Sequence, residues 1–185
     1  MSTRTVEDLF LFVSPRRPTR AWLRGAGADI PAAIGHASLT RRPREGDGAT
    51  PSGAFRLREV LYRADRLARP RTALPIRPLR PDDGWCDAPF HPAYNRPVRH
   101  PFPASAERLW RDDHVYDIIV VIDFNVSRRA QGLGSAIFFH LARPDFSPTL
   151  GCIAIPEAAM RRVLAMSTPR TRLITDPPRF RRPRP

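Results

Sequence analysis

The sequence contains no lysine, and its two cysteines, Cys86 and Cys152, are too few for a disulfide framework. They could form one disulfide or stay as two free thiols. Long apolar runs are also missing: the longest, residues 9–13 and 118–122, are far shorter than the ~20 residues of a membrane-spanning helix. The first of these runs follows two acidic residues and is too short for the core of a signal peptide. We therefore expect no integral membrane segment, and the chain as written looks soluble and unexported.

All of the positive charge comes from arginine, and the formal net charge is +13. Such a balance favours anionic partners such as nucleic acid, a membrane surface or an acidic polymer. Arginine without lysine, together with 22 prolines and many alanines, is also typical of a compositional bias of a whole proteome. No stretch alternates basic with aromatic residues, and no helix-turn-helix, zinc-finger or RNP-like segment is present. We therefore expect no nucleic-acid partner.

The hydrophobic pattern predicts seven strands and one helix. Strands are predicted at residues 9–13, 21–23, 54–63, 115–123, 135–142, 152–155 and 171–176. In the third of these, Phe55 and Leu57 share one face and Arg56 and Arg58 the other. Residues 156–167 predict a helix, whose apolar stripe we expect in the core: Met160, Val163 and Leu164.

The length of 185 residues fits one domain, which we place at residues 1–175. Prolines recur every few residues in a segment of about 64–103, and they exclude long helices and central strands there. We expect this segment to be an irregular insertion. The proline- and arginine-rich tail, residues 176–185, is expected to be mobile.

One pair of residues suggests catalysis. His140 lies at the end of a predicted strand, and the loop after it leads to Cys152, which is preceded by a glycine and followed by a short apolar strand. Such a loop can pair the imidazole with the thiol, where a histidine lowers the thiol pKa and accepts its proton. Gly151 lets backbone N–H groups approach an oxyanion, and the Thr149 hydroxyl can donate nearby. Packing of a small buried residue is the alternative interpretation of Cys152.

The other candidate groups are interpreted as structural. Cys86 and His91 could be part of a metal site, but two further ligands are not evident and the spacing fits no zinc pattern, so no metal is expected. The remaining histidines lie in arginine-rich loops and are expected to be solvated: His36, His100 and His114.

The segment "GSAIFFHLARPDFSPTLGCIAI" resembles the signature of the L,D-transpeptidase catalytic domain family, in which a strand-end histidine precedes a loop and [Ser/Thr]-x-Gly-Cys. His140, Thr149, Gly151 and Cys152 match that signature. Upstream, "DGATPSGAF" resembles the Thr-Pro-x-Gly-x-Phe element of the same family, matched by residues 50, 51, 53 and 55. The two matches are far apart and in the right order. The resemblance covers roughly residues 8–170. It implies a mainly β fold, a curved, barrel-like β-sandwich with a few short helices, in which the helix of residues 156–167 packs outside.

By this resemblance, Cys152 would be the nucleophile and His140 its base in acyl transfer through a thioester on peptidoglycan stem peptides, without a cofactor. Gly151, Thr149, Ser135 and Arg143 would serve the oxyanion and the substrate. Many members carry an arginine two residues after the cysteine, where this chain has Ala154. Another arginine would then have to bind the substrate carboxylate, and the candidates are Arg128, Arg129 and Arg143.

The resemblance leaves three functions open. The protein could form 3-3 crosslinks or exchange the terminal D-amino acid, could hydrolyse muropeptides as a carboxypeptidase, or could bind an anionic polymer without catalysis. Family membership would place it in the periplasm or cell envelope, whereas the absence of a visible signal peptide leaves action on cytoplasmic muropeptides open. The sequence carries no signal for an oligomeric state.

Overall fold

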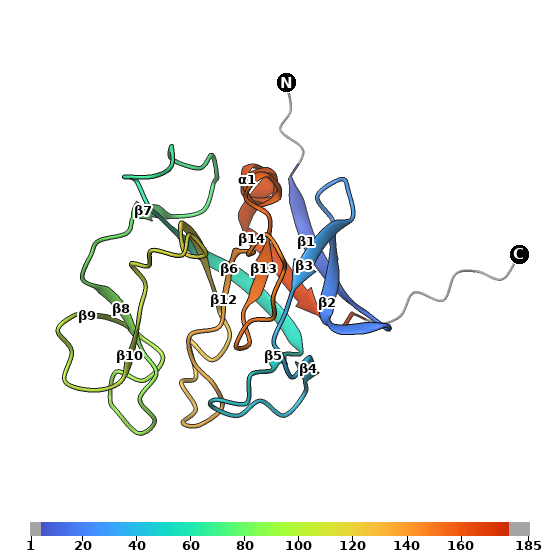
Figure 1. Cartoon of the computed structure of the whole chain (residues 1–185). Helices are drawn as coiled ribbons and strands as arrows, with labels where there is room; N and C mark the ends of the chain where they lie inside the picture. Colours follow the sequence, from blue (N-terminus) through green and yellow to red (C-terminus); the bar gives the residue numbers. More distant parts are fainter. Residues whose placement is uncertain (1–4, 178–185) are drawn as a thin grey trace, which may run out of the picture.

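The computed structural model describes residues 5–177, and strands make up most of its regular structure (Figure 1). Over these residues, fourteen strands are distributed over a nine-stranded sheet, a three-stranded sheet and a two-stranded ladder. The large sheet holds β1 (Val6–Ser14), β2 (Arg17–Arg24), β3 (Ile30–Ala33), β6 (Gly53–Tyr62), β7 (Ile76–Pro78), β11 (Ile118–Ile122), β12 (Phe138–Leu141), β13 (Ile153–Ile155) and β14 (Ser167–Thr175). The three-stranded sheet holds β8 (Asp83–Cys86), β9 (Pro97–Arg99) and β10 (Ala106–Arg108), and the ladder pairs β4 (Leu39–Thr40) with β5 (Thr50–Pro51).

The large sheet closes on itself through β6. The strand order is β11-β12-β13-β3-β2-β1-β14-β6-β7, and β11 also pairs with β6. The first part of β6 pairs with β14, and its second part pairs with β11 on one edge and β7 on the other. Closure of this kind removes free sheet edges. The result is the barrel-like β fold that the sequence analysis expected.

Two apolar clusters lie on opposite faces of β11 and β12. Ile118, Val120, Phe139 and Leu141 belong to the larger cluster inside the closed sheet. Alternate residues of the same strands belong to the second cluster, as does Cys152: Ile119, Val121 and Phe138. The period-2 alternation of strands produces this division, and it places the candidate nucleophile in the second cluster.

The helix α1 (Glu157–Met166) begins directly after Pro156 and packs on the larger cluster. Ala159, Met160, Val163 and Leu164 are buried, which confirms the predicted apolar stripe. Within residues 5–177, α1 is the one α helix, where the sequence analysis expected a few. No helix in this part of the chain is both long and apolar enough to pass through a membrane.

The three-stranded sheet lies beside β6 and β12, on the other side of the molecule from β1, β2 and β3 (Figure 1). Its strands are short, as expected for the proline-rich segment of about 64–103, but β8 is buried along its whole length. β10 pairs with β8 and belongs to the same unit, although it follows the predicted insertion. The second cluster fills the space between this sheet and the barrel, with Trp85 of β8 edge-on to Phe138 of β12.

Several predicted boundaries differ from the structure. The strand predicted at residues 135–142 begins only at Phe138, because Gly134 and Ala136 adopt positive φ angles of 101° and 51° that interrupt an extended chain. The strand predicted at residues 171–176 is longer, and β14 starts at Ser167. Most of the tail that the sequence analysis expected to be mobile, residues 178–185, lies outside the described residues.

Candidate active site

Parallel pairing of β12 with β13 places His140 and Cys152 on one side of the barrel. Phe139 pairs with Ile153 and His140 with Ala154, so Cys152 lies just before the strand that neighbours His140. The loop between the two strands is fixed by backbone hydrogen bonds on both sides of Thr149, from its N–H to Ile34 and from the His36 N–H to its carbonyl. The predicted role of this loop, to bring the strand end beside the next strand start, is confirmed.

The Cys152 sulfur is hydrogen-bonded to the backbone of the residues before β12. Its S–H donates to the Ala136 carbonyl at 3.3 Å, and the Phe138 N–H donates to Sγ at 3.2 Å. Burial raises the pKa of the thiol to about 12. Cys152 is therefore a neutral thiol in the resting protein. The expectation that the neighbouring histidine lowers this pKa is wrong for the resting protein, because burial outweighs any such effect.

The His140 imidazole is oriented by a main-chain carbonyl. Its Nδ1 lies 2.9 Å from the oxygen of Leu141, so Nδ1 carries the proton and donates it, and Nε2 is left with a free lone pair. Burial lowers the pKa of His140 to about 4, with a smaller effect from Arg111 and Arg143. The ring is thus neutral at neutral pH. It packs against the ring of Tyr116 with the centroids 5.1 Å apart.

Steric constraints explain why a glycine precedes the cysteine. Gly151 has φ 125°, and a Cβ added there would lie 2.8 Å from Ile137 Cδ1 and 2.9 Å from the Ala49 carbonyl oxygen. Glycine therefore fits this position far better than any other residue. The Gly151 N–H donates to Thr149 Oγ1 at 3.2 Å, and Thr149 Oγ1 donates to the Cys152 carbonyl at 2.6 Å. Thr149 thus holds the backbone on either side of the sulfur.

Thr50 joins the two family-like motifs. Its hydroxyl is completely buried, donates to the Gly151 carbonyl at 2.8 Å and accepts from the Gly35 N–H at 2.9 Å. The upstream Thr-Pro-x-Gly-x-Phe element therefore supports the backbone that carries the candidate nucleophile. This contact explains why two motifs so far apart in sequence occur together.

Cys152 and His140 line one cavity of about 400 Å³. Cys152 is buried, with 7% of the residue exposed, and it lines this cavity. Leu150, at the rim, is 84% exposed, which shows that the cavity opens to solvent. The described residues that line it are Glu45, Gly46, Asp87, Glu107, Arg111, Val115, Tyr116, Ser135, Ala136, His140, Arg143, Thr149, Leu150 and Cys152.

One part of the cavity wall is acidic. Glu45 accepts hydrogen bonds from the hydroxyls of Tyr94 and, at 2.9 Å, Ser135. Glu107 accepts from the Tyr116 hydroxyl at 2.6 Å, and burial raises the pKa of Glu107. Asp87 also lines the cavity, and its Oδ1 is buried without a hydrogen-bond partner among the described residues.

Two arginines lie beside His140 in the same cavity. Arg111 donates to both carboxylate oxygens of Asp113, at 3.0 and 2.6 Å, and Arg143 donates to one of them at 3.0 Å. The two guanidinium groups lower the pKa of Asp113 to about 2. One carboxylate shared by two guanidinium groups leaves this pair with a net positive charge. The pair is therefore suited to bind a carboxylate.

One of the three arginines predicted to bind the substrate lines the cavity. Arg143 lines the cavity, whereas Arg128 and Arg129 are not among its lining residues. Arg111 was not predicted and joins Arg143 there. Ser135 lines the cavity too, but its hydroxyl is used by Glu45 and the residue lies before β12, not in it. Thr149 also lines the cavity, whereas Gly151 does not.

The residues interpreted as structural have varied surroundings. Both cysteines are free, and Cys86 is fully buried with its sulfur 3.8 Å from His91 Nδ1. Within residues 5–177, no group of three or more potential ligands is arranged to hold a metal ion. The expectation of a solvated His100 is wrong, because its Nε2 is buried above Gly84, where no side chain blocks the ring.

Sequence reasoning missed the acidic wall and Tyr116. Glu107, Arg111 and Tyr116 fall in "ERLWRDDHVYD", which precedes β11 and shows no periodicity. The loops and short strands of this segment bring the three side chains to the cavity through long-range packing, which spacing does not reveal. A polar, aromatic segment directly before a buried strand was the one available signal.

The comparison with protein families agrees with this geometry. The family model of the YkuD L,D-transpeptidase catalytic domain matches residues 9–175, nearly the whole chain. No curated protein and no solved structure gives a significant match. The family match spans both motifs, the barrel and the cavity. The chain therefore belongs to the YkuD family of L,D-transpeptidase catalytic domains, a family that acts on peptidoglycan.

Proposed function

We propose that this protein is a cysteine acyltransferase that acts on peptidoglycan stem peptides through a thioester, forming 3-3 crosslinks or exchanging the terminal D-amino acid. The observation that carries the proposal is the placement of the Cys152 thiol and the His140 imidazole in one open cavity, with Nε2 of His140 unprotonated. This pair has the groups that nucleophilic acyl transfer needs. The cell envelope, where peptidoglycan is assembled, is the proposed location.

In the first half-reaction, Cys152 Sγ attacks the carbonyl carbon at the L-centre of diaminopimelate in a stem tetrapeptide. The thiol proton passes to His140 Nε2, the bond to D-alanine breaks, and His140 gives the proton to the leaving amine. In the second half-reaction, an amine of a second stem or a free D-amino acid attacks the thioester. Its proton passes to His140, the C–S bond breaks, and the proton returns to sulfur.

Because both groups are neutral before the reaction, His140 acts as a general base. Cys152 and His140 are both neutral, since burial raises the thiol pKa to about 12 and lowers the imidazole pKa to about 4. The S–H group, which donates to Ala136, must rotate towards Nε2 before proton transfer. The proton therefore moves as the C–S bond forms, and no thiolate–imidazolium ion pair exists beforehand.

Backbone N–H groups near the sulfur can stabilise the oxyanion. The Gly151 N–H is already used by Thr149. The Cys152 N–H precedes the ladder of β13 and donates to no acceptor among residues 5–177. It is the proposed oxyanion donor. The Arg111–Asp113–Arg143 group, on the same cavity, is the proposed receptor for a substrate carboxylate and takes the role of the arginine that Ala154 replaces.

The proposal is tested by mass spectrometry and by product analysis. Incubation with a carbapenem should add one acyl group to the protein, and defined tetrapeptide muropeptides should yield crosslinked dimers or exchanged tetrapeptides. Cys152→Ala should abolish both results and His140→Ala should reduce them at least a hundredfold. Cys86→Ala serves as the control and should retain both. Release of tripeptides alone would show a hydrolase, and no adduct with no product would overturn the proposal.

A further inference from the structure

We propose that the outer face of β1, β2 and β3 carries a second binding site, which takes the glycan chain of peptidoglycan while the stem peptide occupies the cavity. The central residue of this site is Trp22 of β2, and the ligand is a chain of N-acetylated amino sugars. The inference rests on the proposed function for its biological meaning. Sugar binding itself is measured without any stem peptide.

Apolar rings form a row across these three strands, which lie side by side in the large sheet (Figure 1). Trp22 pairs with Phe12 of β1 on one side and with Pro31 of β3 on the other. The neighbours of Trp22 along β2, Ala21 and Leu23, are buried, so Trp22 points away from the core. Trp22 is 46% exposed, although tryptophan is highly buried on average. The row therefore presents a large apolar ring to solvent.

A hollow of about 370 Å³ lies beside Trp22, between the strands and the turn that follows β12. Asp145 and Phe146 of that turn form its other wall. Arg20 of β2 joins the two walls, because its Nη2 donates to the Asp145 carbonyl at 2.6 Å and its guanidinium carbon lies 5.2 Å from the Phe146 ring centroid. These contacts hold the walls at a fixed separation.

The side chains of the hollow match the chemistry of an amino sugar. The C–H groups of a pyranose ring pack well on the face of an aromatic ring, which is apolar and carries partial negative charge. Arg17 and Arg20 can donate hydrogen bonds to sugar hydroxyls and N-acetyl carbonyls. The exposed carboxylate of Asp145 can accept from hydroxyls. This mixture favours a polar, uncharged sugar over a purely apolar or a purely anionic ligand.

One turn joins the hollow to the cavity that contains Cys152. The Phe146 N–H donates to the Arg143 carbonyl at 2.9 Å, which closes a β-turn and brings the two Cα atoms within about 7 Å of each other. Arg143 lines the cavity and Phe146 lines the hollow. An extended peptide spans about 3.3 Å per residue, so a tetrapeptide stem is long enough to pass from a glycan in the hollow into the cavity. The two sites can therefore hold one substrate molecule.

The first test is a titration with a tetrasaccharide of the peptidoglycan glycan that carries no stem peptide, followed by the indole N–H signals in NMR spectra. The Trp22 signal, assigned by its loss in Trp22→Phe, should shift with saturable binding, whereas the signal of the buried Trp85 should stay in place. Trp22→Ser should weaken binding at least tenfold, as expected for a central aromatic residue of a binding surface. Phe90→Ser removes an exposed aromatic ring outside the hollow and should bind like the wild type.

A second measurement connects the site to the reaction. Trp22→Ser should raise the KM for stem peptides attached to glycan about tenfold more than the KM for free tetrapeptides. The absence of a saturable shift at Trp22, or equal effects of Trp22→Ser and Phe90→Ser, would overturn the inference. A change from dimer to monomer in Trp22→Ser, measured by sedimentation, would overturn it too, because the face would then bind a second copy of the chain. Sugar binding without turnover would overturn the proposed function alone.

Discussion

At the scale of single residues, the site depends on a histidine that is buried and uncharged. His140 is 6% exposed, and the Leu141 carbonyl accepts a hydrogen bond from its Nδ1–H group. An imidazole in this state can accept a proton from sulfur but is costly to protonate while it stays buried. The same property that makes it a base therefore makes the fold sensitive to acid.

The stability of the protein should fall between pH 6.5 and pH 4 because of His140. Its pKa is about 4 in the folded protein, against an ordinary value of 6.5, so in this interval the unfolded chain binds the proton and the folded chain does not. The loss is on the order of 3 kcal/mol, complete near pH 4. Urea unfolding at pH 7.5 and 4.5 should show a larger drop for wild type than for His140→Gln. Equal drops in the two proteins would contradict this prediction.

Residue identity and spacing predicted His140, Cys152, Gly151 and Thr149, because each belongs to a local motif. The neutral state of the thiol could not be predicted, since it depends on burial and on Glu107, which lies far away in sequence. The same holds for Arg111: it reaches the cavity from a loop without periodicity, and only packing of the small sheet on the barrel brings it there.

At the scale of elements, the short ladder of β4 and β5 supports the candidate nucleophile. Thr50, in β5, is the member of this ladder that binds both Gly35 and Gly151 through its hydroxyl. A two-residue strand thereby fixes the turn that leads into β13. The family-like motif at this point is thus a structural support for the site and lies outside the cavity lining.

Removal of the Thr50 hydroxyl should loosen this turn. Thr50→Val keeps the shape but leaves the buried Gly35 N–H and Gly151 carbonyl unpaired, which should cost about 2 to 4 kcal/mol of unfolding free energy. Turnover should fall with it, because Cys152 follows Gly151 directly. Thr50→Ser keeps the hydroxyl and should lose less on both measures. The prediction is wrong if the two variants unfold and react alike.

The elements themselves were predicted unevenly. Strands with alternating or β-branched patterns were predicted, and the alternation holds in β12, where Phe138 and His140 lie opposite Phe139 and Leu141. β3 and the strands of the small sheet were missed, because these strands of three or four residues are too short to show a pattern. Their pairing comes from tertiary packing, as with β8, the central strand of the small sheet, whose Trp85 packs on Phe138 of the barrel.

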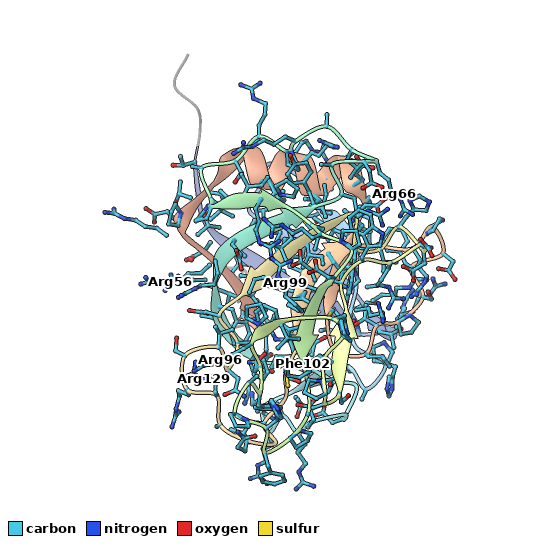
Figure 2. All side chains as sticks on the ribbon, turned by 90° about the vertical axis from the view of Figure 1, so that its left-hand side faces the viewer. Arg56, Arg66, Arg96, Arg99, Phe102 and Arg129 are labelled. Carbon is cyan, nitrogen blue, oxygen red and sulfur yellow. The ribbon has the colours of Figure 1, made fainter. Side chains whose placement is uncertain are left out.

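At the scale of the whole molecule, the charge of the cavity and that of the surface differ in sign. The face around the three-stranded sheet displays Arg56, Arg66, Arg96, Arg99 and Arg129 (Figure 2), and the chain carries a net +13. The cavity lining has carboxylates from Glu45, Asp87 and Glu107 against the guanidinium groups of Arg111 and Arg143. Close charges dominate the local potential, because salt screens distant ones.

A cationic thiol reagent should therefore reach Cys152 faster than an anionic one. We expect trimethylammonium-ethyl methanethiosulfonate to modify Cys152 severalfold faster than sulfonato-ethyl methanethiosulfonate, after division by the rates with a free small thiol. Glu107→Gln should reduce this preference, and higher salt should reduce it as well. Faster reaction of the anionic reagent would show that the arginine-rich surface sets the potential at the sulfur.

The closure of the barrel has one more consequence. Tyr62 and Ile118 are paired across β6 and β11, so the chain leaves the barrel and returns to it at the same rung of the ladder. Apart from β7, which pairs with β6, the chain between them is an insertion whose length costs the barrel little, and it includes Glu107, Arg111 and Tyr116. Sequence changes in that insertion can alter the surroundings of the nucleophile and the choice of substrate, while β12, which holds His140, and β13, which follows Cys152, keep their sequence. Substrate selectivity and the barrel are therefore free to evolve separately.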